Sequence, residues 1–331
     1  MTADHHEPDV SRFSPQSFAP IAVARRSGLD ESFHAGAGVV LDAEGTEVAS
    51  IGDPDLAVYL RSSLKAFQAA AMVEAGLDLP PDLLALVCAS HSGESFHVEG
   101  VLTILASAGL GVDALGNAAT LPVGEAARAE VLAAGGVAAS IYQNCSGKHA
   151  GMLATCAVNG WSTHDYLAFD HPLQRMISEW IDGHGATIHH VGVDGCGAPT
   201  HALSLSEGAG LLRSMALSSS PVFDAMSAHP DFVGGSGRDV TDWMGAVPGL
   251  VAKDGAAGVQ ALVLTEGERR GWSALYKIAD GSSEARSAVI PAALAAMGVD
   301  VERAIAGTDL GVVPVLGGGS PVGTIDPIAW I

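Results

Sequence analysis

Residues 37–52 read AGVVLDAEGTEVASIG, in which two runs rich in β-branched residues flank the short turn AEG. β-Branched residues favour strands, and a glycine-containing turn between two such runs predicts a β-hairpin. The C-terminal part repeats this pattern with GVQALVLT at residues 258–265 and RRGWSALYKIA at residues 269–279, and GVVPVL at residues 311–316 is typical of a further strand. Strand pairs near both ends of the chain indicate one sheet to which both ends contribute.

Between these hairpins the sequence is mainly helical. Apolar residues at helical spacing predict a helix over residues 62–75, with a serine to cap its start and Gly76 to end it. We interpret the short apolar run LLALVCAS, residues 83–90, as a buried strand. The helical spacing recurs at residues 97–109, 147–158, 172–183 and 283–298.

These elements predict an α+β fold, a mixed α/β three-layer arrangement with an antiparallel sheet flanked by helices. No linker or change in composition divides the chain, so we expect one catalytic domain over residues 1–331. A helical subregion is expected at about residues 62–220.

Charge and composition narrow the class of partners. The chain has 331 residues, 48% of them apolar, and a formal charge of −21 from 37 acidic and 16 basic residues. A surface this acidic repels phosphate backbones, so we expect no nucleic acid or membrane partner and favour small molecules and proteins. The N-terminal residues lack the basic and apolar regions of an export signal, and no apolar stretch is long enough to span a membrane. We therefore expect a soluble, cytoplasmic protein.

Two scarce residue types draw attention to particular stretches. Four cysteines in a long cytoplasmic chain are more typical of buried thiols, metal ligands or catalytic groups than of a disulfide framework. Only four of the 16 basic residues are lysines, namely Lys65, Lys148, Lys253 and Lys277.

Ser62 and Lys65 form an S-x-x-K pattern at the start of the first predicted helix. Residues three apart lie on one helix face, so the hydroxyl and the amine can come within hydrogen-bond reach. The positive potential of a helix N-terminus favours a developing alkoxide, and a lysine whose pKa is lowered by burial can accept the proton. The same spacing also arises by chance at a solvent-facing helix start.

A polar cluster, CASHSGE at residues 88–94, follows the predicted strand. It brings together a thiol, hydroxyls, an imidazole and a carboxylate, and such side chains at a strand end can project into a cleft. The alternative is a polar turn that caps the next helix, with Cys88 in the core.

The stretch NCSGKH at residues 144–149 is the most unusual one. Cys145 lies one helical turn before Lys148, and Cys196, in VDGCGAP, has glycines on both sides that leave it accessible. These three side chains can be interpreted as a zinc site, although ordinary zinc sites use cysteine or histidine rather than an amine. Because the lysine must lose its proton to bind, such a site would be weak at acid pH.

Together these stretches resemble the asparaginase II family, the thermolabile rhizobial type of L-asparaginase. The resemblance covers nearly the whole chain and implies hydrolysis of L-asparagine to L-aspartate and ammonia. It also implies a fold similar to serine-dependent glutaminases, β-lactamases and penicillin-binding proteins, usually as a homodimer. The motifs that carry it include RSSLK at residues 61–65, CASHSGE at residues 88–94, NCSGKHAGML at residues 144–153, GVDGCGAP at residues 192–199, GSGR at residues 235–238 and LGGGSPVG at residues 316–323.

Carried over residue by residue, the family pattern pairs Ser62 with Lys65 and places a second pair, Ser90 and Lys253, beside it. We expect Ser62 to be the nucleophile and Lys65 its base. Ser90 and Lys253 would relay the proton or tune Lys65, because two nearby ammonium groups lower each other's pKa.

The resemblance also implies ligands for a metal and for the substrate. A zinc site like that of the family would use Cys145, Lys148 and Cys196. We expect one ion per chain that is either structural or orients the substrate through a bound water. Matched residues that line the substrate pocket are Arg61, His149 and Asp194.

Two alternative functions stay open at this point. One is a β-lactamase or esterase, since S-x-x-K also serves those enzymes, although the chain lacks an export signal. The other is a zinc-dependent module that binds an amino acid without catalysis.

Lys277 has no role that these motifs assign. Arginine cannot replace a lysine that must lose its proton, which applies to Lys65, Lys148 and Lys253. We expect Lys277, in contrast, to tolerate replacement by arginine with almost no effect.

Overall fold

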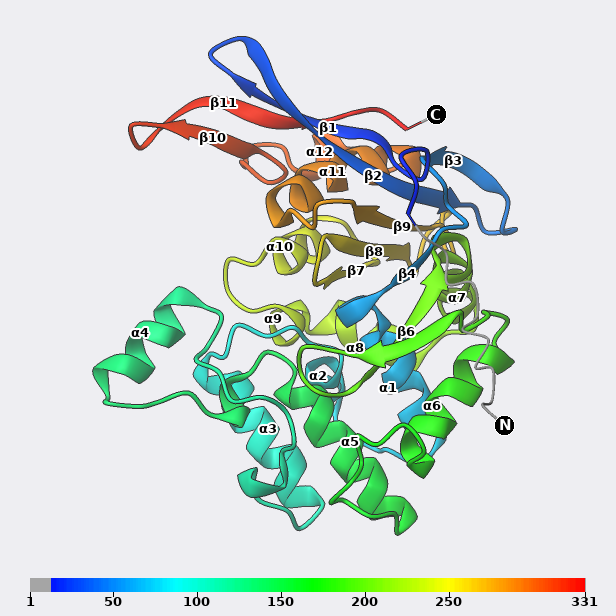
Figure 1. Ribbon diagram of the computed structural model, residues 1–331, viewed down its shortest axis with the longest axis vertical. Coiled ribbons are helices and arrows are strands. Elements are labelled where there is room, and N and C mark those ends of the chain that lie inside the picture. Colours follow the sequence, from blue (N-terminus) through cyan, green and yellow to red (C-terminus); the bar gives the residue numbers. More distant parts are fainter. Residues whose placement is uncertain (1–12, 331) are drawn as a thin grey trace, which may run out of the picture.

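The structure is a computed structural model that describes residues 13–330. Within these residues the main sheet has eight strands in the spatial order β10, β11, β1, β2, β9, β8, β7, with β3 beside β2, and all neighbours pair antiparallel (Figure 1). Its strands are β1 (Ala19–Arg26), β2 (Leu29–Leu41), β3 (Glu47–Ile51), β7 (Leu250–Gly255), β8 (Val259–Leu264), β9 (Ser273–Ile278), β10 (Val313–Gly317) and β11 (Ser320–Pro327). Both ends of the described chain therefore contribute to one antiparallel sheet, which confirms the predicted α+β fold.

A smaller sheet and a set of helices make up the rest of the described chain. The small sheet has the order β4 (Ala57–Tyr59), β6 (Pro199–Ser204), β5 (His190–Val193). The α-helices are α1 (Lys65–Glu74), α2 (Pro81–Val87), α3 (Ser95–Ser107), α4 (Glu125–Ala133), α5 (Ser146–Asn159), α6 (Pro172–Gly183), α7 (Leu205–Leu217), α8 (Pro221–Ala228), α9 (Pro230–Val233), α10 (Asp239–Ala246), α11 (Ser283–Ala296) and α12 (Val301–Ala304). Short 3₁₀ turns are η1 (Arg61–Leu64), η2 (Val112–Ala114) and η3 (Ser140–Tyr142).

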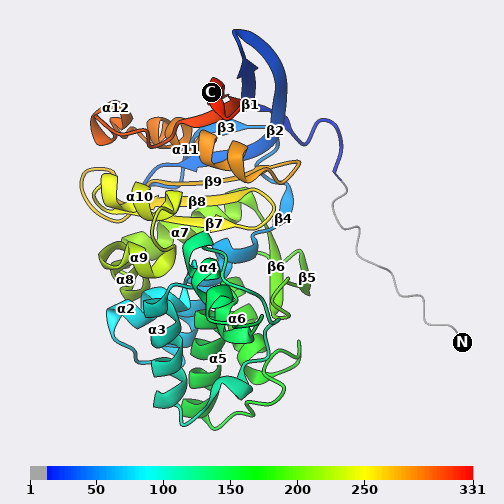
Figure 2. The same ribbon diagram turned by 90° about the vertical axis from the view of Figure 1, so that its left-hand side faces the viewer.

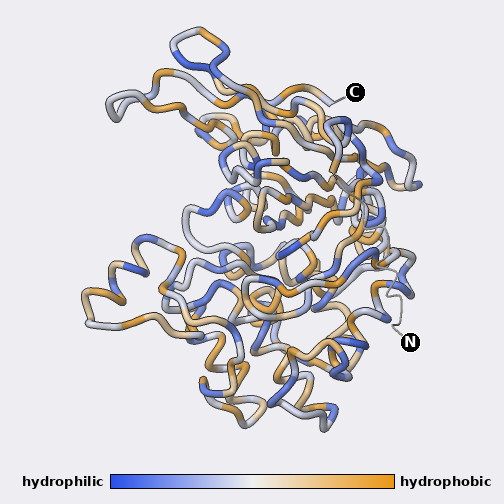
Figure 3. The backbone as a smooth tube through the Cα atoms, viewed as in Figure 1, coloured by the Kyte–Doolittle hydropathy of each residue, from blue (hydrophilic) through white to orange (hydrophobic). Residues whose placement is uncertain are grey.

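Helices α7 and α11 cover opposite faces of the main sheet (Figure 2). A Cβ atom at Gly208 of α7 would touch the side chain of Leu275, whereas the next residue on β9, Tyr276, donates its hydroxyl hydrogen to the carbonyl of Arg286 on α11. Successive residues of a strand point to opposite faces, so the two helices sandwich β9. Every residue of β8 and β9 is buried, and hydrophobic residues recur along these strands (Figure 3). The three layers that the sequence predicts are thereby formed.

Most predicted elements are confirmed. The hairpin in residues 37–52 is formed by the end of β2 and by β3, and the second hairpin is formed by β8 and β9. The helix predicted over residues 62–75 is η1 followed by α1, and Gly76, with φ of 95°, follows its end. No helix within the described residues is both long and apolar enough to cross a membrane.

The strand predicted at residues 83–90 is wrong, because Pro81–Val87 forms helix α2. Pro81 occupies the first turn, where its missing N–H group is no disadvantage, and the amide of Leu84 donates to the carbonyl of Pro80. Leucine and alanine are strong helix formers, and a short apolar run cannot be assigned to helix or strand by periodicity alone.

Close packing across the sheet leads to a stability prediction. A Cβ atom at Gly38 on β2 would lie 2.6 Å from the Cβ of Tyr276 and 2.5 Å from the ring of Trp330. Overpacking of this kind typically costs about 1–3 kcal/mol, so Gly38→Ala should lower the free energy of unfolding in denaturant by about that amount. The matched change Gly210→Ala in α7 meets no atom within 4 Å. It should stabilise the protein by about 0.5–1 kcal/mol, because alanine is the better helix former. Equal effects of the two substitutions would contradict this packing.

Candidate active site

The segment that carries Ser62 enters its helix through a strained turn. Arg61, between β4 and the rest of η1, has φ of 53°, a left-handed conformation that is costly for a residue with a side chain. η1 packs against β7 and β8, so this turn lies where the main sheet meets the helices. Strain of this kind is retained mainly at functional sites, and here it directly precedes the candidate nucleophile.

The hydroxyl of Ser90 lies between two buried lysines. Lys253 Nζ is 2.7 Å from Ser90 Oγ, and Lys65 Nζ is 3.4 Å from the same oxygen. Lys65 also donates to the carbonyl of Ala89. Ser90 is held in turn by its own amide, which donates to the carbonyl of Val233 at 3.0 Å. Residues from α1, from β7 and from the segment after α2 therefore converge on one hydroxyl.

Lys253 carries the clearest electrostatic signature of the site. Burial lowers the pKa of its ammonium to about 8, although the carboxylate of Asp254 acts in the opposite direction. Asp254 binds both Lys253 and Arg238, whose Nη2 is 3.0 Å away, and these cations hold the carboxylate pKa well below its usual range despite burial. Arg238 also donates to the carbonyl of Ser90 at 3.1 Å. Lys253 is thus a lysine that can lose its proton near neutral pH.

Ser62 and Ser90 line the same cavity, which has a volume of about 530 Å³. In the described part of the chain no hydrogen bond joins Ser62 to Lys65, and the lysine points to Ala89 and Ser90 instead. The two serine–lysine pairs of the sequence interpretation therefore lie together as one cluster, in which Ser90 contacts both amines.

A turn between β7 and β8 forms another wall of this cavity. Gly255, Ala256, Ala257 and Gly258 line it together with Ser62. Within residues 13–330 the backbone N–H groups of Ser62, Ala256 and Ala257 make no hydrogen bond. Unpaired backbone donors in the wall of a cavity can stabilise negative charge that develops on a bound carbonyl oxygen.

Arg61 and Asp194 form an ion pair at the entrance to η1. Arg61 Nε lies 2.6 Å from Asp194 Oδ1, which also accepts a hydrogen bond from the amide of Gly195 at 2.8 Å. Burial alone would raise the pKa of Asp194, but Lys148 and Arg61 outweigh it and lower that pKa. The carboxylate is therefore ionised and already oriented.

His149 is fully buried and neutral. Burial, with nearby Lys148, lowers its pKa well below the ordinary value. Its Nδ1 lies 2.7 Å from the hydroxyl of Tyr166, which accepts a hydrogen bond from the amide of Gly116. With the tyrosine hydroxyl as donor to Nδ1, the imidazole proton lies on Nε2, and we assign this tautomer. Nε2 has no partner among the described residues and is a free donor.

Cys145, Lys148 and Cys196 meet in a buried cluster at the start of α5. Lys148 Nζ lies 3.2 Å from Cys196 Sγ, and both thiols pack with Ala198. A hydrogen bond from Cys196 lowers the pKa of Cys145 well below its ordinary value, and Lys65 and Lys148 lower it further. Burial would lower the pKa of Lys148, but the two thiols and Asp194 outweigh this and raise it. The cluster thus adjoins Lys65 and links the cysteines to the serine–lysine group.

The donor chemistry of this cluster fits a zinc ion. Two thiols and an amine, all buried, offer the soft ligands that zinc prefers, once Lys148 has released its proton. Among residues 13–330 no group of three or more His, Cys, Asp or Glu side chains is placed to hold a metal ion, so a zinc ion at this cluster would require Lys148 as a ligand.

The ten candidate residues therefore fall into two adjoining groups. Ser62 and Ser90 line the 530 Å³ cavity, and Lys65 and Lys253 join this group through their hydrogen bonds to Ser90. The described lining includes neither lysine, and it does not include Arg61, His149 or Asp194. The metal and substrate candidates surround Lys148 instead, and the Arg61 backbone connects the groups because it precedes Ser62.

Several cavity residues have no counterpart in the sequence interpretation. The sequence motifs assign no role to Asp254, to Arg238 or to the turn at residues 255–258. The signal that points to them is the sequence KDGAAG, in which an apolar strand ends in a charged pair and a glycine-bounded turn.

Lys277 does not lie at a tolerant position. It is 8% exposed, and its Nζ donates to the carbonyls of Ala257 and Ile278, each at 2.6 Å. The expectation that arginine replaces it harmlessly is therefore wrong, since a hairpin in the sequence does not reveal that its lysine faces the sheet interior. Cys88, in contrast, is buried as expected, and burial raises its pKa to about 12.

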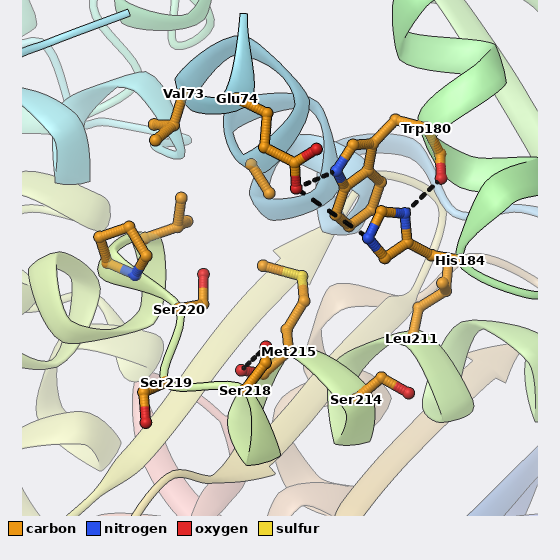
Figure 4. Close-up of a pocket in the computed structure, with 13 residues that line it drawn as sticks. Val73, Glu74, Trp180, His184, Leu211, Ser214, Met215, Ser218, Ser219 and Ser220 are labelled. Atoms are coloured by element: carbon orange, nitrogen blue, oxygen red, sulfur yellow. Dashed lines mark hydrogen bonds and ion pairs between the residues drawn. The ribbon is translucent and has the colours of Figure 1, made fainter. Parts of the chain in front are cut away.

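A second cavity, of about 360 Å³, lies among the ends of α1, α6 and α7 (Figure 4). Glu74 Oε1 accepts a hydrogen bond from the indole of Trp180 at 2.8 Å, and the ring of His184 stacks on that indole. The described residues that line it include neither lysine nor cysteine. None of the ten candidate residues is among the described residues that line this second cavity.

Comparison with protein families shows which family the chain matches. The family described as L-asparaginase II matches residues 22–327, a span that contains every candidate residue from Arg61 to Lys253. A search of curated proteins found no match.

Proposed function

The chain belongs to the L-asparaginase II family, and from this premise we propose that it hydrolyses L-asparagine through an acyl-enzyme formed on Ser62. The family supports asparagine hydrolysis in general, whereas the serine–lysine mechanism is our own inference. The observation that carries it is the hydroxyl of Ser90 held between Lys65 and Lys253, in the cavity that Ser62 also lines.

The two lysines supply the base. Lys65 and Lys253 share one hydroxyl, and burial together with the neighbouring Lys65 ammonium lowers the pKa of Lys253, so Lys253 loses its proton at a pH where an isolated lysine keeps its own. Ser90 can pass a proton between the amines because a hydroxyl both donates and accepts. Lys65, three residues after Ser62, then serves as the immediate base.

The reaction proceeds in two steps. Ser62 Oγ attacks the side-chain amide carbon of asparagine while its proton passes to Lys65, and the N–H groups of Ser62, Ala256 and Ala257 receive the oxyanion. The C–N bond breaks as the proton moves from Lys65 to the leaving nitrogen, which releases ammonia and leaves an aspartyl ester on Ser62. Water then attacks the ester and gives one proton to the lysine pair, which passes it to Ser62 Oγ as the ester bond breaks. The new carboxyl group releases its remaining proton to solvent, so aspartate leaves and Ser62 and the lysine pair are restored.

Three residues suit the ends of the substrate. Asp194 is ionised and can bind the α-ammonium group of asparagine. Arg61 and the free Nε2–H of His149 are donors for its α-carboxylate. The pKa of His149 is well below its ordinary value, so its imidazole stays neutral. We therefore assign His149 a role in orienting the substrate rather than in proton transfer.

Cys145, Lys148 and Cys196 would hold one zinc ion in this proposal. When bound, zinc supplies a Lewis-acidic positive charge beside Asp194. The residues themselves must release protons first, since Lys148 is held in its ammonium form by the neighbouring thiols and carboxylate. The expected homodimer and the cytoplasmic location stay predictions.

Removal of the nucleophile is the direct test of the function. Ser62→Ala should reduce ammonia release from asparagine by at least about 10³-fold, and Lys65→Met should have nearly the same effect. Ser107→Ala, whose hydroxyl bonds to a carbonyl at the end of α3, serves as the matched serine control and should retain full activity. Full activity of Ser62→Ala would refute the nucleophile.

Two further assays address the alternative functions. Turnover of a chromogenic lactam without turnover of asparagine would favour the hypothesis that the protein is a β-lactamase or an esterase. Calorimetric binding of asparagine without ammonia release from the parent protein would favour a binding module.

The pH dependence follows from the lysine pair. Because the deprotonated amine is the active form and the pKa of Lys253 is about 8, kcat/KM should rise with pH along a limb centred near that value. Asp254→Asn removes a carboxylate that raises the pKa of Lys253, so the limb should move to lower pH. Asp242→Asn changes a carboxylate on α10 outside the lysine cluster and should leave the limb in place. A limb that does not move in Asp254→Asn would contradict this electrostatic assignment.

Elemental analysis tests the metal. The purified parent protein should contain about one zinc ion per chain, Cys196→Ser should contain much less, and Cys156→Ala, which changes a buried thiol elsewhere on α5, should match the parent. Zinc binding should strengthen as pH rises, because Lys148 must lose its proton. A parent protein purified without chelators that holds no zinc would remove the metal from this account.

A further inference from the structure

Lys277 is a buried ammonium that the proposed mechanism does not use. It lies at the end of β9, opposite Val259 of β8, on the same face of the strand as Leu275. Its Nζ makes two hydrogen bonds of 2.6 Å, to the carbonyls of Ala257 and Ile278. Lysines are rarely buried unless they are paired. These two carbonyl acceptors therefore stabilise the buried ammonium group of Lys277.

One of these acceptors belongs to the cavity wall. Ala257 lies in the β7–β8 turn and has φ of 59°, a left-handed conformation that residues with a side chain rarely adopt. The turn lines the cavity of Ser62 and Ser90, and it carries two of the three N–H groups assigned to the oxyanion. A contact that holds the Ala257 carbonyl therefore acts on the conformation of these donors.

The strand end around Lys277 also contacts the turn through its backbone. The amide of Ile278 donates to the carbonyl of Gly258 at 2.8 Å. A Cβ atom at Gly258 would lie 3.2 Å from the backbone of Gly281, and one at Gly281 would lie 3.3 Å from Ala257 Cα. Residues 277–281 thus pack against the turn. Within the described residues, Lys277 makes the only side-chain hydrogen bond between residues 277–281 and the turn.

The charged groups around Lys277 are Asp280 and Arg61. Burial and Arg61 lower the pKa of Lys277, and Asp280 partly offsets them. Arg61 directly precedes Ser62, so Lys277 lies behind the same corner of the cavity as the nucleophile and the turn.

We propose that Lys277 is a positioning residue for the amide hydrolysis, which holds the β7–β8 turn in its left-handed form and so keeps the Ala256 and Ala257 donors beside Ser62. This inference rests on the proposed function. The ammonium group of Lys277 is compact and donates hydrogen bonds to two carbonyl oxygens at once. The planar guanidinium of arginine spreads its donors over a larger group and cannot reproduce that geometry in a buried space.

The test compares Lys277→Met with two further variants in steady-state assays on asparagine. Lys277→Met should lower kcat by about tenfold or more, with KM changed by less than about threefold, because the donors act on the transition state rather than on ground-state binding. Lys277→Arg should not restore kcat. Adding Ala257→Gly to Lys277→Met should recover much of the loss, because glycine adopts the left-handed conformation without help.

A matched control separates positioning from general stability. Ser273→Ala removes another buried bond from β9 to a backbone carbonyl, that of Ala209 on α7, far from the turn. It should reduce stability without changing kcat. Unchanged kcat in Lys277→Met, or a loss that Ala257→Gly does not relieve and that Ser273→Ala reproduces, would overturn the proposal.

Amide hydrogen exchange keeps this test independent of the proposed reaction. If the parent protein does not hydrolyse asparagine, the proposed function fails, but the peptide over residues 254–262 should still exchange faster in Lys277→Met than in the parent or in Ser273→Ala. Lys277→Gln, which retains one donor, replaces Lys277→Met if the latter does not fold. Equal exchange of that peptide in all variants would refute the positioning role by itself.

Discussion

Burial of all four lysines is the constraint on which the rest of the structure depends. Lys65, Lys148, Lys253 and Lys277 are each at most 8% exposed, in a chain that has no other lysine. A buried ammonium is costly unless acceptors surround it, so each position requires oxygen or sulfur atoms from elements far apart in the sequence. Lys65 donates hydrogen bonds to Ala89 and Ser90, and Lys253 donates to Asp254. Lys148 donates to Cys196, and Lys277 donates to Ala257. The fold can be understood as the arrangement that brings these acceptors into place.

This requirement explains why the cavity lies where the sheet meets the helices. The strand β7 brings Lys253, the start of α1 brings Lys65, and the segment after α2 brings Ser90, so no single element holds the site. Burial, with the nearby Lys65 and Arg238, lowers the pKa of Lys253, while Asp254 limits how far it falls. Base strength near neutral pH therefore comes from an arrangement of charges and not from any histidine, since His149 and His91 are buried and neutral.

Much of the fold could be predicted from local patterns, whereas much of the site could not. β-Branched residues around a glycine-containing turn predicted the β2–β3 hairpin, and the helical spacing with the stop at Gly76 predicted α1. The predicted serine cap is wrong, because among residues 13–330 no side chain caps the start of η1 or of α1. The run LLALVCAS failed because apolar content alone does not distinguish a buried helix from a strand. Ser62 and Lys65 carried a local signal, but Asp254, Arg238 and the turn at residues 255–258 gain their meaning only from contacts across long sequence separations. The role of Lys277 could not be predicted from the sequence either, because it depends on a hydrogen bond to the carbonyl of Ala257 in the β7–β8 turn.

The central claim is that an aspartyl ester forms on Ser62. The most direct measurement is mass spectrometry of tryptic and chymotryptic peptides after acid quench of the parent protein during turnover of aspartic acid β-hydroxamate, whose activated acyl group should let the ester accumulate. We expect an aspartyl adduct on the peptide that contains Ser62, at that residue. An adduct on Ser90 or Cys145, or turnover at full rate with no adduct anywhere, would contradict it.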